Sequence, residues 1–271
     1  MKRYVFMVSD GTGITAENLG NSLITQFENI EFEKLTLPYI DTVEKAEAVV
    51  ERINICHDEE GVKPLIFMTL INQEVATTIN QAKAHVFDLF NTFLGPLEEE
   101  LQVKSSYTVG RTHGVANLQT YSHRIEAVDY ALAHDDGVKT RGYEKADIIL
   151  IGVSRCGKTP SCLYMALHFG VLAANYPFTD DDLTYFILPE ALKPYKKKLF
   201  GLTIDPERLQ QIRTERRPNS KYASLEQCRL EVSEVEAMYK KENIPYLNST
   251  RFSIEEIATK VLAIAGIKRK F

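Results

Sequence analysis

Hydrophobic positions follow two alternating patterns along the first hundred residues. Short, nearly continuous apolar runs at 4–9, 34–37 and 64–70 are typical of strands buried on both faces of a sheet. Between them lie longer stretches whose apolar residues recur every three or four positions, as on one face of a helix. The apolar faces predicted in this way are Leu19, Leu23 and Phe27 for the first helix, and Val75, Ile79, Val86 and Phe90 for the third. Such alternation predicts a parallel sheet covered by helices.

Capping and breaking residues predict the limits of these elements. Asp41 with Glu44 resembles a capping box at the start of the second helix, and Asn72 is placed to cap the third. Gly95 and Pro96, followed by an acidic run, break the alternation. We therefore predict two domains, at 1–104 and 105–271.

The second half of the chain repeats the alternation. Apolar runs at 148–153, 171–176 and 199–204 predict strands, and helical spacing follows from about 121, 158, 206 and 253. The apolar face predicted for the helix near 121 consists of Ile125, Val128, Ala131 and Leu132.

The strand predicted at 148–153 leads into the most informative motif of the chain. The sequence Gly-Val-Ser-Arg-Cys-Gly-Lys-Thr fits the phosphate-loop pattern of two glycines, a lysine and a hydroxyl residue between a strand and a helix. Glycines permit close approaches that a side chain forbids, so backbone N–H groups and the helix N-terminus can hold anionic oxygens. We predict that phosphate binds to the residues of this motif, which are Gly152, Val153, Ser154, Arg155, Cys156, Gly157, Lys158 and Thr159.

The loop also predicts a magnesium site. In such loops the lysine supplies charge to the transferring phosphate and the hydroxyl residue holds Mg²⁺, roles that fall to Lys158 and Thr159. A strand-end carboxylate completes such a site, and the candidates are the aspartates at 180–182 and Asp205. We assign Asp205 as the metal ligand together with Thr159.

Two polar clusters each allow a functional and a structural interpretation. Asp135 and Asp136, just before Gly137, supply either a general base or metal ligand, or a solvated helix end with the glycine as its C-cap. The Asp-Gly-Thr-Gly sequence at 10–13 is either a second anion site or an ordinary glycine turn.

A basic segment leaves the same choice open. Arg213, Arg216 and Arg217 on the helix predicted from 206 either clamp phosphates, as a lid does, or form a solvated basic helix end.

Composition and charge exclude several classes of protein. The 271-residue chain has a net charge of −5, which argues against a nucleic-acid or membrane-surface protein. Its N-terminal apolar run, 4–8, is too short for a signal peptide or a membrane span. The four cysteines lack metal-binding spacing, which predicts reduced thiols in a cytoplasm. Cys156 fits a tolerated small residue better than a redox control point.

The assembled motifs resemble the pyruvate, phosphate dikinase regulatory protein family over essentially the whole chain. The form of the loop at 154–160, Ser-Arg-Cys-Gly-Lys-Thr-Pro, is similar to that of its phosphoenolpyruvate synthase branch. One departure is Gly13, where alanine or another residue is expected to be common. The segments that carry the resemblance are 9–13, 111–113, 133–137, 152–160, 173–178, 201–209, 222–224 and 248–250.

The resemblance implies a bifunctional enzyme. An ADP-dependent serine/threonine kinase would phosphorylate a threonine of phosphoenolpyruvate synthase and inactivate it, and a phosphate-dependent phosphorylase would remove that group and form pyrophosphate. One phosphate nest suits both reactions, because it can hold either the β-phosphate of ADP or inorganic phosphate. On this hypothesis Asp136 is the base that orients the attacking hydroxyl, while Lys158 and Arg155 stabilise the transferring group.

The resemblance also implies an N-terminal Rossmann-like α/β domain, a C-terminal P-loop kinase-like α/β domain and a homodimer. ADP, inorganic phosphate and Mg²⁺ are the implied co-substrates and cofactor. Two other functions fit the loop: a small-molecule kinase that uses ATP, and a nucleotide-sensing adaptor without transfer activity. Phosphorylation of a metabolite by ATP, with ADP inactive as a donor, would favour the small-molecule kinase. Unchanged function of the Asp136→Asn variant would favour the adaptor.

Overall fold

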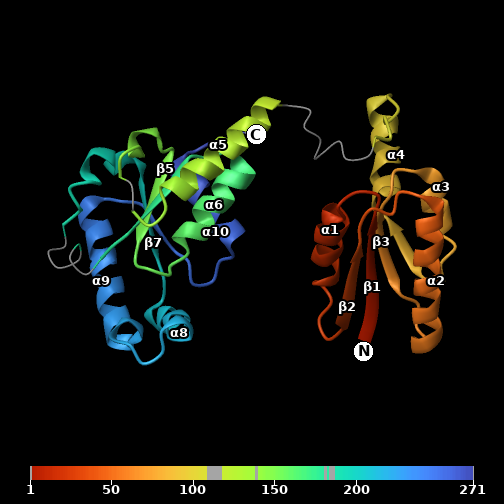
Figure 1. Ribbon diagram of the computed structural model, residues 1–271, viewed down its shortest axis with the longest axis horizontal. Coiled ribbons are helices and arrows are strands. Elements are labelled where there is room, and N and C mark those ends of the chain that lie inside the picture. Colours follow the sequence, from red (N-terminus) through yellow and green to blue (C-terminus); the bar gives the residue numbers. More distant parts are fainter. Residues whose placement is uncertain (1, 109–117, 138–139, 180–181, 183–186, 271) are drawn as a thin grey trace. The chain divides into compact units, whose positions relative to one another are not determined.

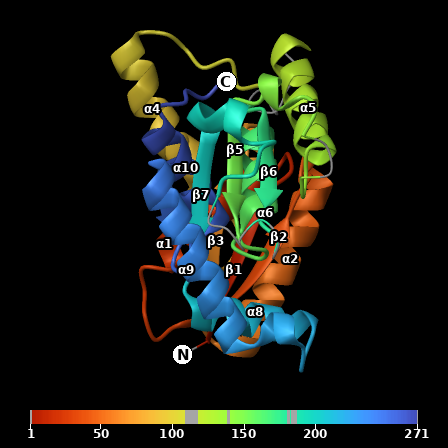
Figure 2. The ribbon, with the colours of Figure 1, turned by 90° about the vertical axis from the view of Figure 1, so that its left-hand side faces the viewer.

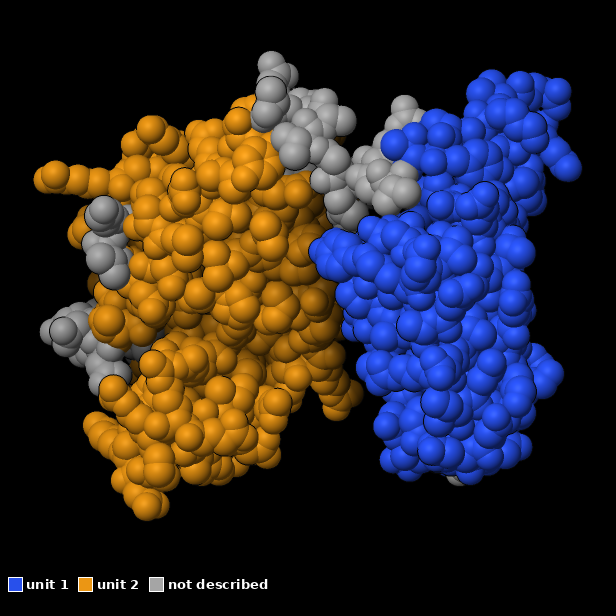
Figure 3. Space-filling view, turned by 45° about the vertical axis from the view of Figure 1, so that its right-hand side comes forward, with its two compact units in different colours: residues 1–116 blue, residues 117–271 orange. Residues whose placement is uncertain are grey.

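The computed structural model of the chain describes residues 2–108, 118–137, 140–179, 182 and 187–270. Two compact units make up the chain, Met1–Ala116 and Asn117–Phe271, and Figure 3 colours them separately. The boundary predicted after residue 104 stays a prediction, because 109–117 lie outside the described residues. The motif at 111–113 lies outside them as well.

Unit 1 contains a four-stranded parallel sheet in the order β2-β1-β3-β4. Successive side chains of a strand point to opposite faces, so Val5 and Met7 pack with α1, whereas Phe6 and Val8 pack with α2 and α3. The helices thus cover both faces of the sheet (Figure 1). In chain order the elements are β1 (Lys2–Ser9), α1 (Ile14–Ile24), β2 (Glu31–Leu37), α2 (Val43–Glu60), β3 (Leu65–Thr69), α3 (Gln73–Ile79), β4 (His85–Asp88) and α4 (Leu89–Leu101).

The apolar face predicted for α1 was partly wrong. Leu23 and Phe27 are 44% and 61% exposed, and α1 instead buries Ala16, Gly20 and Ile24. A Cβ atom at Gly20 would lie 2.7 Å from the sulfur of Met7. Helix and sheet approach so closely here that small residues make the contact.

Other limits in unit 1 also differ from the predictions. Thr42, rather than Asp41, caps α2 by accepting a hydrogen bond from the Lys45 N–H. The helix capped by Asn72 ends at Ile79, and the residues beyond it form β4 and the start of α4. A strand of four residues is too short for its period to stand out from a helical one. The Gly-Pro pair at 95–96 lies inside α4, so these residues do not break the alternation as predicted.

Unit 2 contains a second four-stranded parallel sheet, in the order β6-β5-β7-β8. Helices α5, α6 and α10 lie on one face and α9 lies on the other (Figures 1 and 2). The elements are α5 (Leu118–Ala133), η1 (Tyr143–Lys145), β5 (Ile148–Gly152), α6 (Lys158–Phe169), β6 (Ala173–Pro177), η2 (Lys193–Lys198), β7 (Leu199–Thr203), α8 (Pro206–Arg216), η3 (Lys221–Ala223), α9 (Leu225–Glu242), β8 (Tyr246–Asn248) and α10 (Ile254–Ala265).

The sequence patterns of unit 2 are largely confirmed. All five residues of β5 are buried, and Ser253 and Glu256 form both halves of the capping box at α10. In α5, however, Ile125 and Leu132 are 43% and 60% exposed, while two alanines of that helix face α6. Both sheets are parallel and covered by helices, so the predicted α/β class is confirmed.

The strand order of unit 2 determines where a ligand can bind. From β5 the chain passes to β6 on one side and then returns to β7 on the other. In such sheets ligands bind in the crevice beyond the carboxyl ends of the strands, where the order reverses. The loop that follows β5 lies at this reversal. No helix in the described part of the chain is long and apolar enough to span a membrane.

Candidate phosphate-binding site

The loop between β5 and α6 has a backbone that requires its glycines. Gly157 has φ +96° and a Cβ atom at Gly152, where φ is +154°, would lie 2.3 Å from the carbonyl oxygen of Leu202. Arg155 also adopts a left-handed conformation, with φ 78°. This is a backbone that ordinary side chains disfavour, as expected of a loop shaped to bind a ligand.

The carbonyl groups of this loop are held by the surrounding protein, whereas N–H groups at its end are not. Among the described residues, the N–H groups of Gly157 and Thr159 have no protein acceptor, and the N-cap makes no side-chain bond. Exposed donors at a helix N-terminus bind anions. The bonds to carbonyl groups are Phe178 N to Gly152 (3.1 Å), Lys158 Nζ to Gly152 (3.0 Å) and Val153 (2.8 Å), Arg213 to Ser154 (3.2 Å) and Ser249 Oγ to Cys156 (2.9 Å).

A hollow of about 250 Å³ opens beside the loop. Three cationic side chains and one carboxylate line the hollow, so it favours an anionic ligand. Lys158 is only 4% exposed, whereas Arg155 and Arg216 are exposed. The lining residues are Asp136, Ser154, Arg155, Gly157, Lys158, Thr159, Pro160, Ile212 and Arg216.

Thr159 contacts a carboxylate, and that carboxylate belongs to Asp135. The Thr159 hydroxyl donates to Asp135 Oδ1 at 2.8 Å, and the amide of Asn175 donates to the same oxygen. Asn175, buried in β6, also accepts the backbone N–H of Asp136 at 3.1 Å through its side chain. The two aspartates therefore lie side by side, with Asp135 against the threonine and Asp136 lining the hollow.

The other predicted carboxylates lie in different surroundings. Asp205 is the N-cap residue of α8, and its carboxylate accepts a bond from the Asn248 side chain at 2.9 Å. Its role as a metal ligand stays a prediction. The carboxylate of Asp182 accepts bonds from Tyr176 and Thr179, and 180–181 lie outside the described residues. No group of three or more His, Cys, Asp or Glu side chains suited to a metal occurs in the described part of the chain.

The structure distinguishes the arginines of α8. Arg213 is fully buried, pairs with Glu231 at 2.6 Å and bonds the carbonyl of Ser154. Tyr222 stacks under the same guanidinium, 4.1 Å from its ring centre, and donates its hydroxyl to Ser154 Oγ at 3.1 Å. Arg216, one turn further on, lines the hollow.

The family model described as kinase/pyrophosphorylase matches residues 5–262. The chain belongs to this family. A Legionella pneumophila (strain Corby) protein named "Putative phosphoenolpyruvate synthase regulatory protein" is 76% identical over 270 residues, covering 100% of both chains. Proteins of the same name from Pseudomonas aeruginosa (strain LESB58) and Stutzerimonas stutzeri (strain A1501) are 57% identical and cover 100% of this chain and 99% of their own.

The match confirms the resemblance that the motifs indicated. The matched residues include both the loop and the Asp135–Asn175 network. Sequence patterns missed Asn175, Tyr222 and Glu231 as parts of the site. For Asn175 a signal was present, because it is a single polar residue within a predicted apolar strand.

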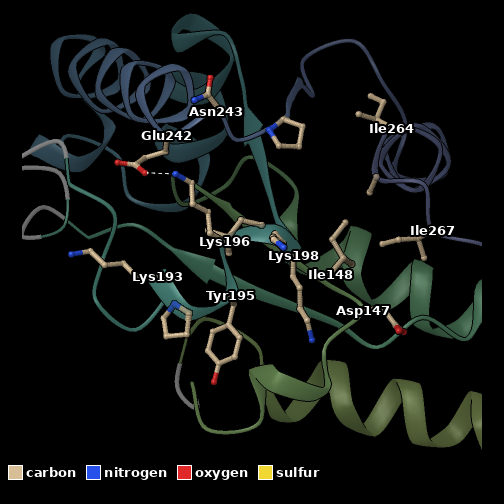
Figure 4. A pocket seen from close by; sticks show the side chains of 15 residues that line it. Asp147, Ile148, Lys193, Tyr195, Lys196, Lys198, Glu242, Asn243, Ile264 and Ile267 are labelled. Carbon is tan, nitrogen blue, oxygen red and sulfur yellow. Dashed lines mark hydrogen bonds and ion pairs between the residues drawn. The ribbon is translucent and has the colours of Figure 1, made fainter.

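A larger hollow of about 870 Å³ lies at the opposite ends of β5 and β7 (Figure 4). Asp147 and Ile148 line it at the start of β5, together with lysines of η2. Lys196 is paired with Glu242 at 2.8 Å, and Asp147 is paired with Lys270 at 2.5 Å. This hollow therefore shares no lining residue with the one beside the loop that follows β5.

The structure also bears on two other hypotheses from the sequence, which concern the turn at 10–13 and the role of Cys156. In the turn at 10–13, the Asp10 carboxylate accepts the Ile71 N–H at 2.7 Å and the Ser9 hydroxyl accepts the Gly11 N–H, which favours a structural turn. All four cysteines are free thiols. Burial raises the pKa of the Cys156 thiol, which disfavours a reactive thiolate.

Proposed function

We propose that this kinase/pyrophosphorylase regulates phosphoenolpyruvate synthase by two opposed phosphoryl transfers. As an ADP-dependent kinase, it phosphorylates a threonine of the synthase and inactivates it. As a phosphate-dependent phosphorylase, it removes that phosphate and forms pyrophosphate. The names of the relatives support the synthase as the target. A cytoplasmic location and a homodimer remain part of this proposal.

The observation that supports it best is the union of a phosphate nest, cations and a carboxylate in one hollow. Unpaired N–H groups at the start of α6 can hold phosphate oxygens, and Lys158 and Arg155 add positive charge. Asp136 lines the same hollow. Phosphoryl transfer depends mainly on alignment and charge neutralisation, so this single site suits two acceptors.

In the kinase direction the synthase threonine attacks the β-phosphorus of ADP. The bond between that phosphorus and the bridging oxygen breaks, AMP leaves, and the hydroxyl proton passes to Asp136. Lys158 and Arg155 stabilise the charge on the transferring group. Asp136, which has a left-handed backbone (φ 51°), lines this hollow.

In the phosphorylase direction an oxygen of inorganic phosphate attacks the phosphorus of phosphothreonine. The bond from phosphorus to the threonine oxygen breaks, pyrophosphate forms, and the proton of HPO₄²⁻ restores the threonine hydroxyl. The attacking group is already an anion, so this direction depends less on a base. The same nest holds inorganic phosphate as the attacking group.

The residues beside Thr159 suit a magnesium ion. Mg²⁺ prefers oxygen ligands and is usually bound by one or two carboxylates together with substrate phosphates. The Thr159 hydroxyl and the Asp135 carboxylate, 2.8 Å apart, provide such oxygens beside the phosphate loop. We propose that they hold the ion, with Asp205 as the alternative carboxylate. When bound, Mg²⁺ would neutralise charge on the phosphates.

A labelling experiment tests the function. Purified phosphoenolpyruvate synthase is incubated with this protein and either β-³²P-ADP or γ-³²P-ATP, and labelled amino acids are identified after hydrolysis. We expect label on threonine from ADP, coupled to loss of synthase activity, and none from ATP. Label from ATP alone, or on a small molecule instead of the synthase, would contradict the proposal and favour a small-molecule kinase.

A further inference from the structure

We propose that Arg216 of α8 binds the phosphate-bearing ligand directly, which makes α8 a part of the binding site. This inference rests on the proposed function, because it requires that the hollow beside the loop holds phosphate. The arginines of α8 look alike in sequence, and their surroundings distinguish them.

Helix α8 is held against the phosphate loop by a buried group. Arg213 NH2 bonds Glu231 at 2.6 Å and the carbonyl of Ser154 at 3.2 Å, while its NH1 bonds Glu231 at 3.0 Å and the Tyr222 carbonyl at 3.1 Å. The Tyr222 hydroxyl adds a bond to the Ser154 side chain. A buried charge held by this many partners has one favoured position. These bonds therefore fix the position of α8 relative to the loop.

This fixed position of α8 places Arg216 at the hollow. Residues three and four apart lie on the same side of a helix, so Arg216 follows Ile212 and Arg213 along the face that meets the loop. Ile212 and Arg216 both line the hollow. Within the described part of the chain, the Arg216 guanidinium has no hydrogen bond or ion pair, and the side chain is exposed.

The other charges in the hollow indicate that the Arg216 guanidinium can bind a phosphate group. The Lys158 ammonium is buried and already bonds the carbonyls of Gly152 and Val153. Arg155 and Arg216 are the exposed cations of the hollow, and either can contact a ligand together with Lys158. A guanidinium presents a planar fork of N–H donors that matches two phosphate oxygens at once. The ligand chemistry that fits is a phosphate or diphosphate group, and both ADP and inorganic phosphate carry it.

Binding measurements with a matched control test the inference. Titration calorimetry with ADP and with inorganic phosphate is performed on the wild type, Arg216→Ala, Arg216→Gln and Arg217→Ala. Arg217 is also exposed and carries the same charge, but it does not line the hollow. We expect both Arg216 variants to bind ADP about 10- to 100-fold more weakly, as for loss of a charge-assisted hydrogen bond. Arg217→Ala should bind within about twofold of the wild type, a change typical of a screened surface charge.

The outcomes separate this inference from the proposed function. If Arg216→Ala binds ADP as tightly as the wild type, Arg216 is not a ligand, and ADP-dependent transfer is unaffected. Equal losses in the Arg216 and Arg217 variants would indicate only general attraction and would also overturn the inference. A wild type that binds neither ADP nor phosphate would remove the proposed function and this inference together.

Discussion

Adjacent aspartates with different contacts allow the base and the metal ligand to be distinguished. Asp135 accepts bonds from Thr159 (2.8 Å) and Asn175, whereas Asp136 lines the hollow. Replacing either by asparagine keeps the shape and removes one negative charge. The two substitutions should therefore change different quantities.

The contacts suggest a size for each effect. Asp135→Asn removes the negatively charged oxygen ligand proposed for Mg²⁺ beside Thr159. The Mg²⁺ concentration for half-maximal rate should therefore rise about tenfold or more. Asp136→Asn removes the proton acceptor, which typically costs about 10²–10⁴ in rate, while the Mg²⁺ requirement stays unchanged. The phosphorylase rate should fall by less than the kinase rate, because inorganic phosphate near neutral pH is already an anion.

The assay measures initial rates in both directions over a magnesium titration, with thermal melts to confirm folding. A shifted Mg²⁺ requirement in Asp136→Asn, with none in Asp135→Asn, would reverse the assignment. Equal losses of both activities in Asp136→Asn would make that residue a metal ligand or a structural residue instead. An unchanged kinase rate would remove it from the mechanism.

Three other predictions concern the loop. Tyr222→Phe removes the bond to Ser154 Oγ but keeps the ring, so the KM for ADP should rise about 2- to 10-fold with kcat little changed; steady-state kinetics with an unchanged KM would contradict this. Gly152→Ala would bring a Cβ atom within 2.3 Å of the Leu202 carbonyl oxygen, and denaturant titration should show at least about 1–3 kcal/mol of lost stability, whereas a wild-type midpoint would refute the close approach. Burial raises the pKa of the Cys156 thiol, so iodoacetamide at pH 7.5 should leave activity intact; inactivation that Cys156→Ser prevents would show a reactive thiolate.

The parts of the site that the sequence predicted are local. Strand, loop and helix are contiguous from 148 to 169, so apolar runs and glycine spacing identify them together. The parts that it could not predict depend on contacts between distant residues. Asn175 meets Asp135 across 40 positions, because the segment after α5 is bonded to β6, where the Asn175 N–H donates to the His134 carbonyl and the Gly137 N–H donates to the Asn175 carbonyl. The spacing of residues along the chain does not predict that contact.

Packing also decided between side chains that look alike in sequence. Arg213 and Arg216 are three residues apart on α8, yet one is fully buried and the other exposed. Glu231 on α9, the carbonyl of Ser154 and the ring of Tyr222 surround Arg213 and explain the difference. In α1 the spacing of Leu23 suggested burial, but the close approach of the sheet at Gly20 selected the neighbouring face.

The most direct test of the shared site is to measure both activities in Lys158→Ala. Lys158 lies at the loop where the phosphoryl group would move in either direction. Lys197→Ala serves as the control, because Lys197 is an exposed lysine that lines only the larger hollow. We expect both kinase and phosphorylase rates to fall by about 10²–10³ in Lys158→Ala, as for loss of a transition-state contact, and neither to change in the control. Loss of the kinase with an intact phosphorylase would show that two separate sites perform the two reactions.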